Sequence, residues 1–364
     1  MTVEVRTPQE LLDRWTSLTL TRSIEDVAWS AELETYDRWS PIDKPIAIAE
    51  YDEITITLND ELAFFGNVYT TTNSYDSTSH TFSISARSRS ASIVDCSTPP
   101  KTWRGKTLEK IATEVLDPFG LAVIVEPSAA SAAGGSFARI ASEDGERVFD
   151  FLTRLAKYRG VLVTTDPVGN VIITTAERRP LPGVTIERGK GRILSASLRR
   201  DGSQRYSEYT TKAQIPAANL DATEPVTISA RVTDAGVPLF RPITLMPDGH
   251  ETRARLKTRA QWERNTRVAR ALEVNYTVAG WLAKPGRLWA PNDLVLVRDK
   301  TFGIATDLLV VEATFRLASD VESTQLRLAH PSAYVVAKDP VPRKRRDRET
   351  FGYRGSEIVI LPDE

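Results

Sequence analysis

One arrangement of predicted strands occurs twice in this chain, and the repeat limits the possible folds more than any other feature. The first copy runs from Asp52 to Ala86 and the second from Pro291 to Val336. Each contains three runs rich in β-branched residues that partly alternate with polar residues, a pattern typical of antiparallel strands. Turn residues separate the runs, with Asn59-Asp60 in the first copy and Ser319-Asp320 in the second. The copies agree in strand order and turn chemistry more than in residue identity, so we interpret them as one β unit used twice.

The first copy belongs to a predicted β region at the start of the chain. Residues 18–24 and 26–33 alternate well enough to form two further strands, and the character of the sequence changes at Thr98-Pro99-Pro100. Large aromatic residues at strand spacing normally fill a core. Three tryptophans are expected to do so here: Trp15, Trp29 and Trp39. Residues 1–99 are therefore predicted to form a first antiparallel β-barrel.

Residues 100–187 are predicted to form a small α/β module. Thr107 fits the N-cap of a first helix, and Gly160 fits the C-terminal cap of a second. Between these helices, the small residues of 128–136 are expected to form a loop. Two runs rich in β-branched residues then flank residues 166–170 (Asp-Pro-Val-Gly-Asn), which is typical of a β-hairpin.

The second copy of the meander predicts a second antiparallel β-barrel over residues 188–337, similar to the first. Residues 180–191, rich in proline and glycine, are predicted to be the linker that leads into it. Residues 192–198 and 207–213 flank an Asp-Gly-Ser turn. We expect them to pair as a hairpin that corresponds to the two strands ahead of the first meander.

Two segments do not fit the repeat. Residues 219–273 are predicted to be an insertion in the second barrel, and residues 251–273 have the pattern of a long helix with few apolar residues among many arginines. Such a helix is more often solvated or interface-facing than buried. Residues 338–364 start with a basic, proline-broken run and are predicted to form an extended tail. A solvated or partner-docking tail is more common than a nucleic-acid arm. The predicted fold class is mainly β with α+β parts.

Composition limits the possible functions further. The chain has 364 residues, which is too long for one ordinary core, and its net charge of -1 gives no strong bias toward nucleic acid or an anionic membrane. Cys96 is the single cysteine, so an intrachain disulfide is impossible and a reducing compartment fits. We find no apolar run of roughly 20 residues and no signal-peptide pattern. We therefore expect synthesis and folding in a cytoplasm, with no membrane span.

The sequence offers little chemistry. The histidines lie far apart, and the glycine-containing segment of residues 189–192 lacks the pattern and the following helix of a phosphate-binding loop. Acidic pairs occur at predicted turns and helix starts, where carboxylates have structural roles. The residues considered were His80, His250, His330, Cys96, Asp52, Glu53, Asp144 and Glu146. We predict no catalytic, cofactor-binding or metal site, and the chain is not expected to be an enzyme.

The order of the predicted units carries a resemblance to a known family. A β unit, a small α/β module and a split β unit follow one another, and the module contains residues 102–112 (TWRGKTLEKIA), Pro118-Phe119-Gly120, residues 145–156 (GERVFDFLTRLA) and Arg159-Gly160-Val161-Leu162. Over residues 1–335 this pattern resembles the baseplate central hub proteins of Mu-like contractile phage tails. It is similar also to the wider hub family of late-control tail proteins and of the hub part of type VI secretion spikes. The β-helix needle of the spike proteins is missing here.

The resemblance implies a structural protein of the virion tail baseplate that is assembled in the host cytoplasm. Family members form a homotrimer in which two similar barrels per chain alternate around a ring. Such a ring would adapt the hexameric tail tube to the trimeric central spike and enclose the DNA channel. The implied partners are the spike, the tail tube or tube-initiator proteins and the baseplate wedge proteins, with no specific nucleic-acid recognition. No cofactor is implied.

Two alternatives remain open on the sequence. The chain could be the hub of a tailocin or other contractile injection system. It could also be a peptidoglycan- or carbohydrate-binding module, because sugar sites commonly use exposed aromatic residues. The aromatic residues of the α/β module are Trp103, Phe119, Phe137, Phe149, Phe151 and Tyr158.

Overall fold

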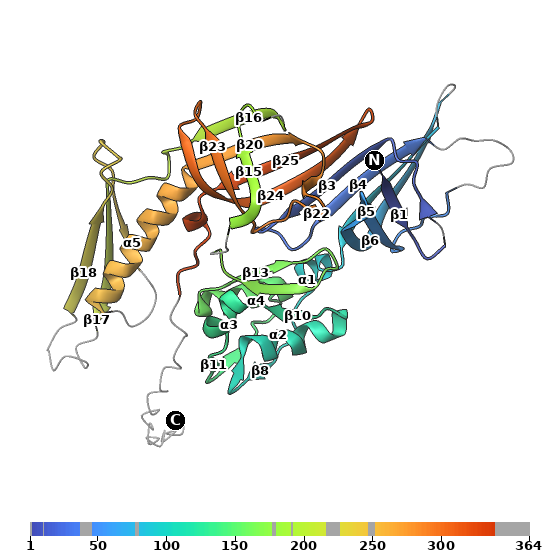
Figure 1. Cartoon of the computed structure of the whole chain (residues 1–364). Helices are drawn as coiled ribbons and strands as arrows, with labels where there is room; N and C mark the ends of the chain where they lie inside the picture. Colours follow the sequence, from blue (N-terminus) through green and yellow to red (C-terminus); the bar gives the residue numbers. More distant parts are fainter. Residues whose placement is uncertain are drawn as a thin grey trace, which may run out of the picture.

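The fold was analysed on a computed structural model of the whole chain (Figure 1). The structure describes residues 2–9, 11–36, 46–76, 80–176, 180–190, 192–215, 226–246 and 252–338. The expected tail of residues 338–364 lies almost entirely outside these ranges, as do Trp39 and His250.

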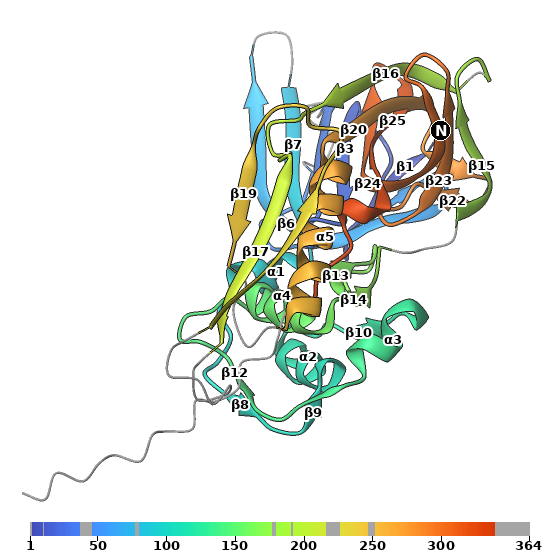
Figure 2. The same ribbon diagram turned by 90° about the vertical axis from the view of Figure 1, so that its left-hand side faces the viewer.

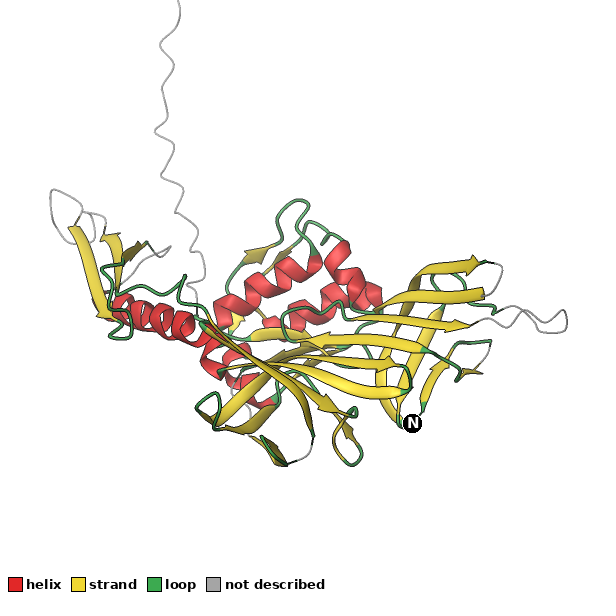
Figure 3. Ribbon diagram, turned by 90° about the horizontal axis from the view of Figure 1, so that it is seen from above, coloured by secondary structure: helices red, strands yellow, loops and turns green. Residues whose placement is uncertain are grey.

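A single large sheet of thirteen described strands dominates the molecule (Figures 1 and 3). In pairing order its main path is β16 (Ile193–Arg200), β20 (Leu272–Ala279), β25 (Val321–Ala329), β24 (Ile304–Ala318), β3 (Ser17–Ser23), β4 (Ser30–Tyr36), β7 (His80–Ser88), β6 (Glu61–Tyr75), β5 (Glu53–Leu58), β1 (Val3–Arg6) and β2 (Leu11–Leu12). Off this path, β23 (Leu294–Asp299) pairs with β24 and in parallel with β15 (Pro180–Glu187). The prediction of a mainly β fold is confirmed.

The sheet divides into two halves of the same design. We call β1 to β7 the N-terminal half, and β15, β16, β20 and β23 to β25 the C-terminal half. The predicted meanders are β5-β6-β7 and β23-β24-β25, and their strands have six, fifteen and nine residues in both halves. Beside them, β4 pairs with β3 and β7, just as β20 pairs with β16 and β25. Strand for strand, β3 to β7 therefore correspond to β16, β20, β23, β24 and β25.

The same irregularity bends both middle strands. In β6 the register against β7 shifts at Tyr69, and in β24 the register against β25 shifts at Val311. Each shift leaves one extra residue on a fifteen-residue strand, which is a β-bulge and increases the local twist. The strands curl strongly in consequence (Figure 2). Among the described residues the expected barrels are not closed rings of paired strands, because β16 does not pair with β15 in the C-terminal half and β3 does not pair with β1 or β2 in the N-terminal half.

One continuous core fills the inside of both halves. It includes Trp15 and Trp29, which confirms their predicted role in packing. Short two-residue turns fix the registers of the hairpins, since Asn59-Asp60 and Ser319-Asp320 all have positive φ, as two-residue hairpin turns require. The predicted turn positions are therefore correct.

The α/β module has a separate core beneath the sheet (Figure 1). Its elements are α1 (Ala91–Asp95), β8 (Thr102–Trp103), β9 (Lys106–Thr107), α2 (Leu108–Leu116), a 3-10 turn (Asp117–Phe119), β10 (Val123–Val125), α3 (Pro127–Ala133), β11 (Ser136–Phe137), β12 (Ile140–Ala141), α4 (Val148–Arg159), β13 (Leu162–Thr165) and β14 (Val171–Thr174). Thr107 caps α2 by accepting from the Lys110 N–H, and Gly160 ends α4 in the left-handed conformation, both as predicted. The loop expected at 128–136 is wrong over α3, where Pro127 begins a helix of good helix formers.

The chain segment between β16 and β20 contributes a second, small sheet. It consists of β17 (Glu208–Ile215), β18 (Val226–Thr233) and β19 (Pro242–Leu245), in the order β18-β17-β19. The helix α5 (Arg253–Arg270) packs across β17 and β18, which confirms the predicted long helix. The remaining elements are β21 (Leu282–Lys284), β22 (Arg287–Leu288) and a 3-10 turn (Pro331–Ala333). No described helix is long and apolar enough to span a membrane.

Two strand predictions are wrong. The expected hairpin of 192–198 with 207–213 does not form, because β16 pairs with β20 and β17 belongs to the small sheet. The strand β20 pairs with β25 and has alternating buried residues, so it extends the large sheet and offers its other edge to β16. The expected linker at 180–191 is largely β15, whose Leu181, Val184 and Ile186 are buried against the core.

Candidate functional site: the seam between the two sheet halves

The two halves meet at one seam, where β3 pairs with the C-terminal part of β24. Seven residue pairs stand opposite each other in antiparallel register, from Ser23 with Glu312 to Ser17 with Ala318. The N-terminal part of β24 pairs with β23 on that edge, and the other edge pairs with β25. The apolar side chains buried at the seam are Leu18, Leu20, Phe315 and Leu317. One strand therefore belongs to both halves and joins them rigidly.

Arg22 in β3 is a charged residue buried at this seam. Its side chain continues the inward-facing series of Leu18 and Leu20 and is only 2% exposed. The guanidinium donates from Nε to the backbone oxygen of Ala63 at 3.0 Å and from Nη2 to that of Leu62 at 3.0 Å. These oxygens are available because the register of β5 and β6 shifts at this point.

The same guanidinium reaches the C-terminal half. Nη1 donates to the backbone oxygen of Trp289 at 3.5 Å, and the group lies 5.2 Å from the ring centre of Phe315 and 5.4 Å from that of Trp29. Burial lowers the pKa of Arg22 to about 9, so the side chain stays charged at neutral pH. Carbonyl oxygens and aromatic faces therefore balance a buried positive charge that links both halves.

Ionic and hydrogen-bonded contacts close one end of the seam. Arg327 in β25 donates to Glu25 at 2.6 Å and to Glu312 at 3.2 Å, while the Tyr334 hydroxyl donates to Glu25 at 2.6 Å. Burial alone would raise the pKa of Glu25, but the hydrogen bonds from Tyr334 and Arg327 outweigh it and lower the pKa. Burial and the Glu25 carboxylate raise the pKa of Tyr334. This cluster ties the loop after β3 to the end of the second meander.

The α/β module docks on the seam through Asn292. The Nδ2 of this residue donates to Thr174 Oγ1 and to the backbone oxygen of Thr175, both at 3.2 Å. Asn292 has φ of 69° and its own N–H donates to Val310 of β24 at 2.8 Å. Asparagine suits this left-handed conformation better than most residues. The end of β14 is thereby attached to the shared strand.

The small sheet and α5 are attached farther along the C-terminal half. Thr211 of β17 donates to the Leu256 backbone oxygen at 2.8 Å, so the sheet and the helix form one unit. Trp262 donates from Nε1 to the backbone oxygen of Val335 at 2.7 Å. Four buried residues make the inner face of the helix: Leu256, Ala260, Thr266 and Ala269. None of the six arginines of α5 is buried and three are exposed, in agreement with the sparse apolar pattern.

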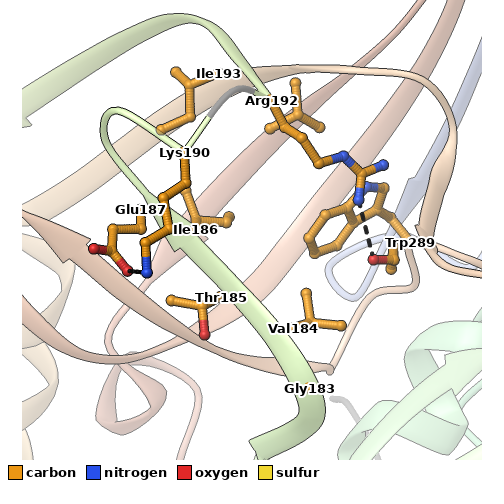
Figure 4. Close-up of a pocket in the computed structure, with 11 residues that line it drawn as sticks. Gly183, Val184, Thr185, Ile186, Glu187, Lys190, Arg192, Ile193 and Trp289 are labelled. Carbon is orange, nitrogen blue, oxygen red and sulfur yellow. Dashed lines mark hydrogen bonds and ion pairs between the residues drawn. The ribbon is translucent and has the colours of Figure 1, made fainter.

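A pocket of about 190 Å³ lies between β15 and the start of β16 (Figure 4). Glu187 and Lys190 form an ion pair at 2.9 Å on one side, and Arg192 donates to the Leu282 backbone oxygen at 2.6 Å on the other. Trp289 forms part of the floor. The charged side chains are already paired with protein groups, so the pocket marks the gap between two edge strands rather than an arranged set of reactive groups.

The residues considered for chemistry are scattered in the structure. His80 begins β7, His330 precedes the last 3-10 turn and Cys96 is exposed after α1. No group of three histidine, cysteine or acidic residues that could hold a metal ion occurs among the described residues. Glu146 accepts two hydrogen bonds from Arg154, both at 2.7 Å. Its environment is explained by helix packing in the module.

The six aromatic residues of the α/β module do not form a sugar-binding platform. Trp103, Phe137 and Phe151 are buried in the module core, and Phe119, Phe149 and Tyr158 pack against it. Trp103 and Phe151 stack on each other at 5.1 Å between ring centres. These positions fit packing rather than recognition of a carbohydrate.

Reasoning from the sequence missed Arg22. The signal was an arginine at the third inward position of an alternating strand, after Leu18 and Leu20. A charged residue in such a series is buried only if its donors are satisfied, and the carbonyl oxygens that satisfy Arg22 lie about 40 residues away in the chain. The partners could not be found without the fold.

Comparisons with known proteins agree with this architecture. Family models match three separate parts of the chain: "Mu phage baseplate assembly protein GpP-like, N-terminal" at residues 2–88, "Baseplate hub protein gp44-like, second domain" at residues 90–175 and "Mu phage baseplate assembly protein GpP, fourth domain" at residues 252–337. The baseplate hub protein gp44 of Escherichia phage Mu is 27% identical over 371 residues, which cover 100% of this chain and 96% of that protein.

Solved structures show the same fold. A 43 kDa tail protein of prophage MuSo2 from Shewanella oneidensis is 30% identical, with a TM-score of 0.80, and the match covers 92% of this chain and 100% of the other. A tail protein from Neisseria meningitidis MC58 is 21% identical, with a TM-score of 0.76 over 93% of this chain and 99% of the other.

A two-part sheet joined by a shared strand, with a small α/β module docked on it, is thus a fold that this chain shares with these tail proteins. The chain belongs to the family of baseplate hub proteins of Mu-like contractile phage tails. It is a structural component of the virion tail baseplate.

Proposed function

We propose that the protein acts as a homotrimeric ring in the baseplate, in which N-terminal and C-terminal halves alternate. Three copies then present six similar β units, so a threefold assembly offers approximately sixfold symmetry. The observation that supports this is the equal design of the halves, with meander strands of six, fifteen and nine residues in both.

In this role the ring adapts a hexameric tail tube to a trimeric central spike, with baseplate wedge proteins as further partners, and encloses the channel through which DNA passes. The net charge of -1 suits a channel that must not hold phosphates tightly. Function then resides in surfaces and not in a catalytic site, so the protein is not an enzyme. The relatives are named as baseplate and tail proteins, which supports this view.

We further propose the domain division expected from the sequence. The two β regions, expected at residues 1–99 and 188–337, act as two similar barrel-like domains of the ring, with the α/β module, expected at residues 100–187, between them. At the boundaries, β15 (Pro180–Glu187) goes with the second β domain and α1 (Ala91–Asp95) with the module. The insertion of residues 219–273 and the tail of residues 338–364 serve contacts with partners. The matching family models, which divide the chain at residues 88, 90 and 175, support separate first β and α/β units, although their boundaries come about 10 residues before the expected ones.

Size-exclusion chromatography with light scattering tests the trimer directly. We expect a species of three times the chain mass of 40.4 kDa at micromolar concentration. A protein that remains monomeric up to ~100 μM, where even a weak specific association of about 5–6 kcal/mol would be visible, contradicts the ring.

A further inference from the structure

The two strand edges that correspond to the seam do not pair with each other within one chain. In the seam, β3 of the N-terminal half pairs with the C-terminal part of β24. Because β3 corresponds to β16 and β24 corresponds to β6, the equivalent pairing would join β16 with the C-terminal part of β6. Among the described strands, β16 pairs only with β20, and β6 beyond its contact with β5 pairs only with β7. Both equivalent edges therefore lack a partner strand in the part of the chain that the structure describes.

The correspondence of the two middle strands is exact enough to transfer register. Tyr51 N–H donates to Val68 and Val68 N–H to Asp52, at 2.7 and 3.0 Å. Asn292 N–H donates to Val310 and Val310 N–H to Asp293, both at 2.8 Å. Val68 therefore corresponds to Val310, and the bulge residue follows at Tyr69 in one strand and at Val311 in the other.

The first strands align in the same way through their neighbours. Leu20 stands opposite Ala31, which stands opposite Ala86 of β7. Leu198 stands opposite Val274, which stands opposite Leu328 of β25. Ala86 and Leu328 are the partners of Val68 and Val310, respectively. Leu198 therefore corresponds to Leu20, and Ser197 corresponds to Thr19.

The two unused edges differ from the seam in exposure. The seam strands alternate between buried and less buried side chains, whereas residues 194–197 of β16 and 72–75 of β6 are exposed. Tyr75, which corresponds to buried Leu317, is 85% exposed. Long exposed edge strands are templates for pairing with another chain, and proteins normally protect them. Here two such edges remain on one molecule.

We propose that β16 of one copy of this chain pairs antiparallel with residues 70–75 of β6 in the next copy and repeats the seam between chains. Transfer of the seam register places Arg200 opposite Thr71, Leu198 opposite Asn73 and Ser197 opposite Ser74. The contact is head-to-tail, since each copy gives β16 on one side and β6 on the other, so it generates a ring if its rotation closes. The proposal rests on the proposed trimer and specifies which strands form it.

Side chains at the new seam fit this register. Ala196 would stand opposite Tyr75, where the internal seam has Leu18 opposite Leu317. A small residue opposite a large exposed ring allows the ring to lie over the partner strand. On the outer face, Ser197 and Ser74 replace Thr19 and Arg316, so two short polar residues meet. Main-chain hydrogen bonds supply the pairing, as in other cases of strand addition.

Cysteine cross-linking tests the register in the full-length chain. The exposed Cys96 is first replaced by serine. Ser197→Cys and Ser74→Cys are then combined in one chain, since both serines are exposed and neither supports the core. Counted from the bond of the Ile24 N–H to Val311, the corresponding pair Thr19 and Arg316 is non-hydrogen-bonded, where the Cα atoms of opposite residues are closest, at roughly 4.5 Å. A disulfide can span this distance.

We expect mild oxidation to give a covalent ladder that ends at three chains under non-reducing denaturing conditions. Each single-cysteine variant should give no cross-link, because a head-to-tail contact never brings two copies of one position together. The slipped pair Ser197→Cys with Asn73→Cys should give little, because its thiols lie on opposite faces. Thr19→Cys with Arg316→Cys is the positive control, and its internal disulfide is detected by protection from thiol alkylation.

The outcomes separate the two proposals. A trimer by light scattering that gives no cross-link, while the internal control oxidises fully, overturns the strand pairing and leaves the trimer standing. A ladder that continues beyond three chains supports the pairing and overturns closure at three. A protein that stays monomeric and is not cross-linked contradicts both the ring and the pairing.

Discussion

Tyr51 and Asn292 occupy the same place in the two halves of the sheet, and both hold the left-handed conformation, with φ of 72° and 69°. Each precedes an aspartate and donates its N–H to the middle strand of its meander. Their surroundings differ, because Asn292 is buried against the α/β module while Tyr51 is 76% exposed. The same backbone position therefore holds the α/β module in one half of the sheet and is exposed in the other.

Opposite effects on stability follow from this difference. Tyr51→Asn should raise the free energy of unfolding by about 1 kcal/mol, because a left-handed conformation costs an ordinary L-residue roughly 1–2 kcal/mol and asparagine less. Asn292→Ala should lower it by about 2 kcal/mol, since two hydrogen bonds and the conformational preference are lost. Urea unfolding followed by fluorescence measures both. Tyr36→Asn, an exposed tyrosine in strand β4, is the control that should show no gain.

Removal of the buried cation should weaken the seam. Arg22→Ala leaves the backbone oxygens of Leu62 and Ala63 without their donor and opens space beside Phe315. We expect a loss of about 3 kcal/mol, because unsatisfied buried groups cost roughly 1–3 kcal/mol and the cavity adds to this. Arg316→Ala, an exposed arginine of the same seam, should cost less than about 0.5 kcal/mol. Equal losses in chemical denaturation would show that Arg22 has no special role.

Close approach of two strands makes Gly66 irreplaceable. A Cβ atom at this position would lie 2.1 Å from the backbone oxygen of Arg87, which is far inside contact distance. Gly66→Ala must separate β6 from β7, so we expect a loss of about 3 kcal/mol or no folded protein. Gly202→Ala is the matched control, because nothing lies within 4 Å of its Cβ position. Thermal unfolding of the two variants should differ by many degrees.

Acid should loosen the α/β module through Glu146. Burial alone would raise the pKa of this carboxyl, but hydrogen bonds from Arg154 and from the Glu143 N–H, with the attraction of the guanidinium, lower it overall. A carboxyl with a lowered folded-state pKa stabilises the fold above its unfolded value of about 4.3. That contribution is lost as pH falls through the lowered folded value.

Glu146→Gln should therefore reduce stability at pH 7 and flatten the fall of stability below about pH 4.5. Hydrogen exchange of α4 amides, measured at pH 7 and pH 4, separates this effect from unfolding of the large sheet. An unchanged acid profile in Glu146→Gln would show that other carboxyls govern the response.

Local patterns predicted much of this fold. The meanders, the turns at Asn59-Asp60 and Ser319-Asp320, the cap at Gly160 and the helix α5 all follow from period, turn chemistry and capping residues near each other in the chain. Local patterns did not predict which strands pair with each other. The pairing of β16 with β20 spans an insertion, and nothing in residues 207–213 shows that this strand joins another sheet.

The seam was likewise beyond prediction from local sequence. The pairing of β3 with β24 depends on the twist that a bulge gives a fifteen-residue strand, and Arg22 depends on carbonyl oxygens exposed by a second register shift. Such features are decided by three-dimensional packing. The duplicated pattern did show that two β units exist, but not that they share a strand.

The shared strand also sets the order of events during synthesis. Thr21 of β3 and Thr314 of β24 touch across the seam although 293 residues separate them. A ribosome that adds about 5–20 residues per second needs roughly 15–60 s to cover that distance. Throughout this interval the edge of β3 that will pair with β24 has no partner strand. The N-terminal half must therefore avoid pairing with other strands until β24 has been synthesised.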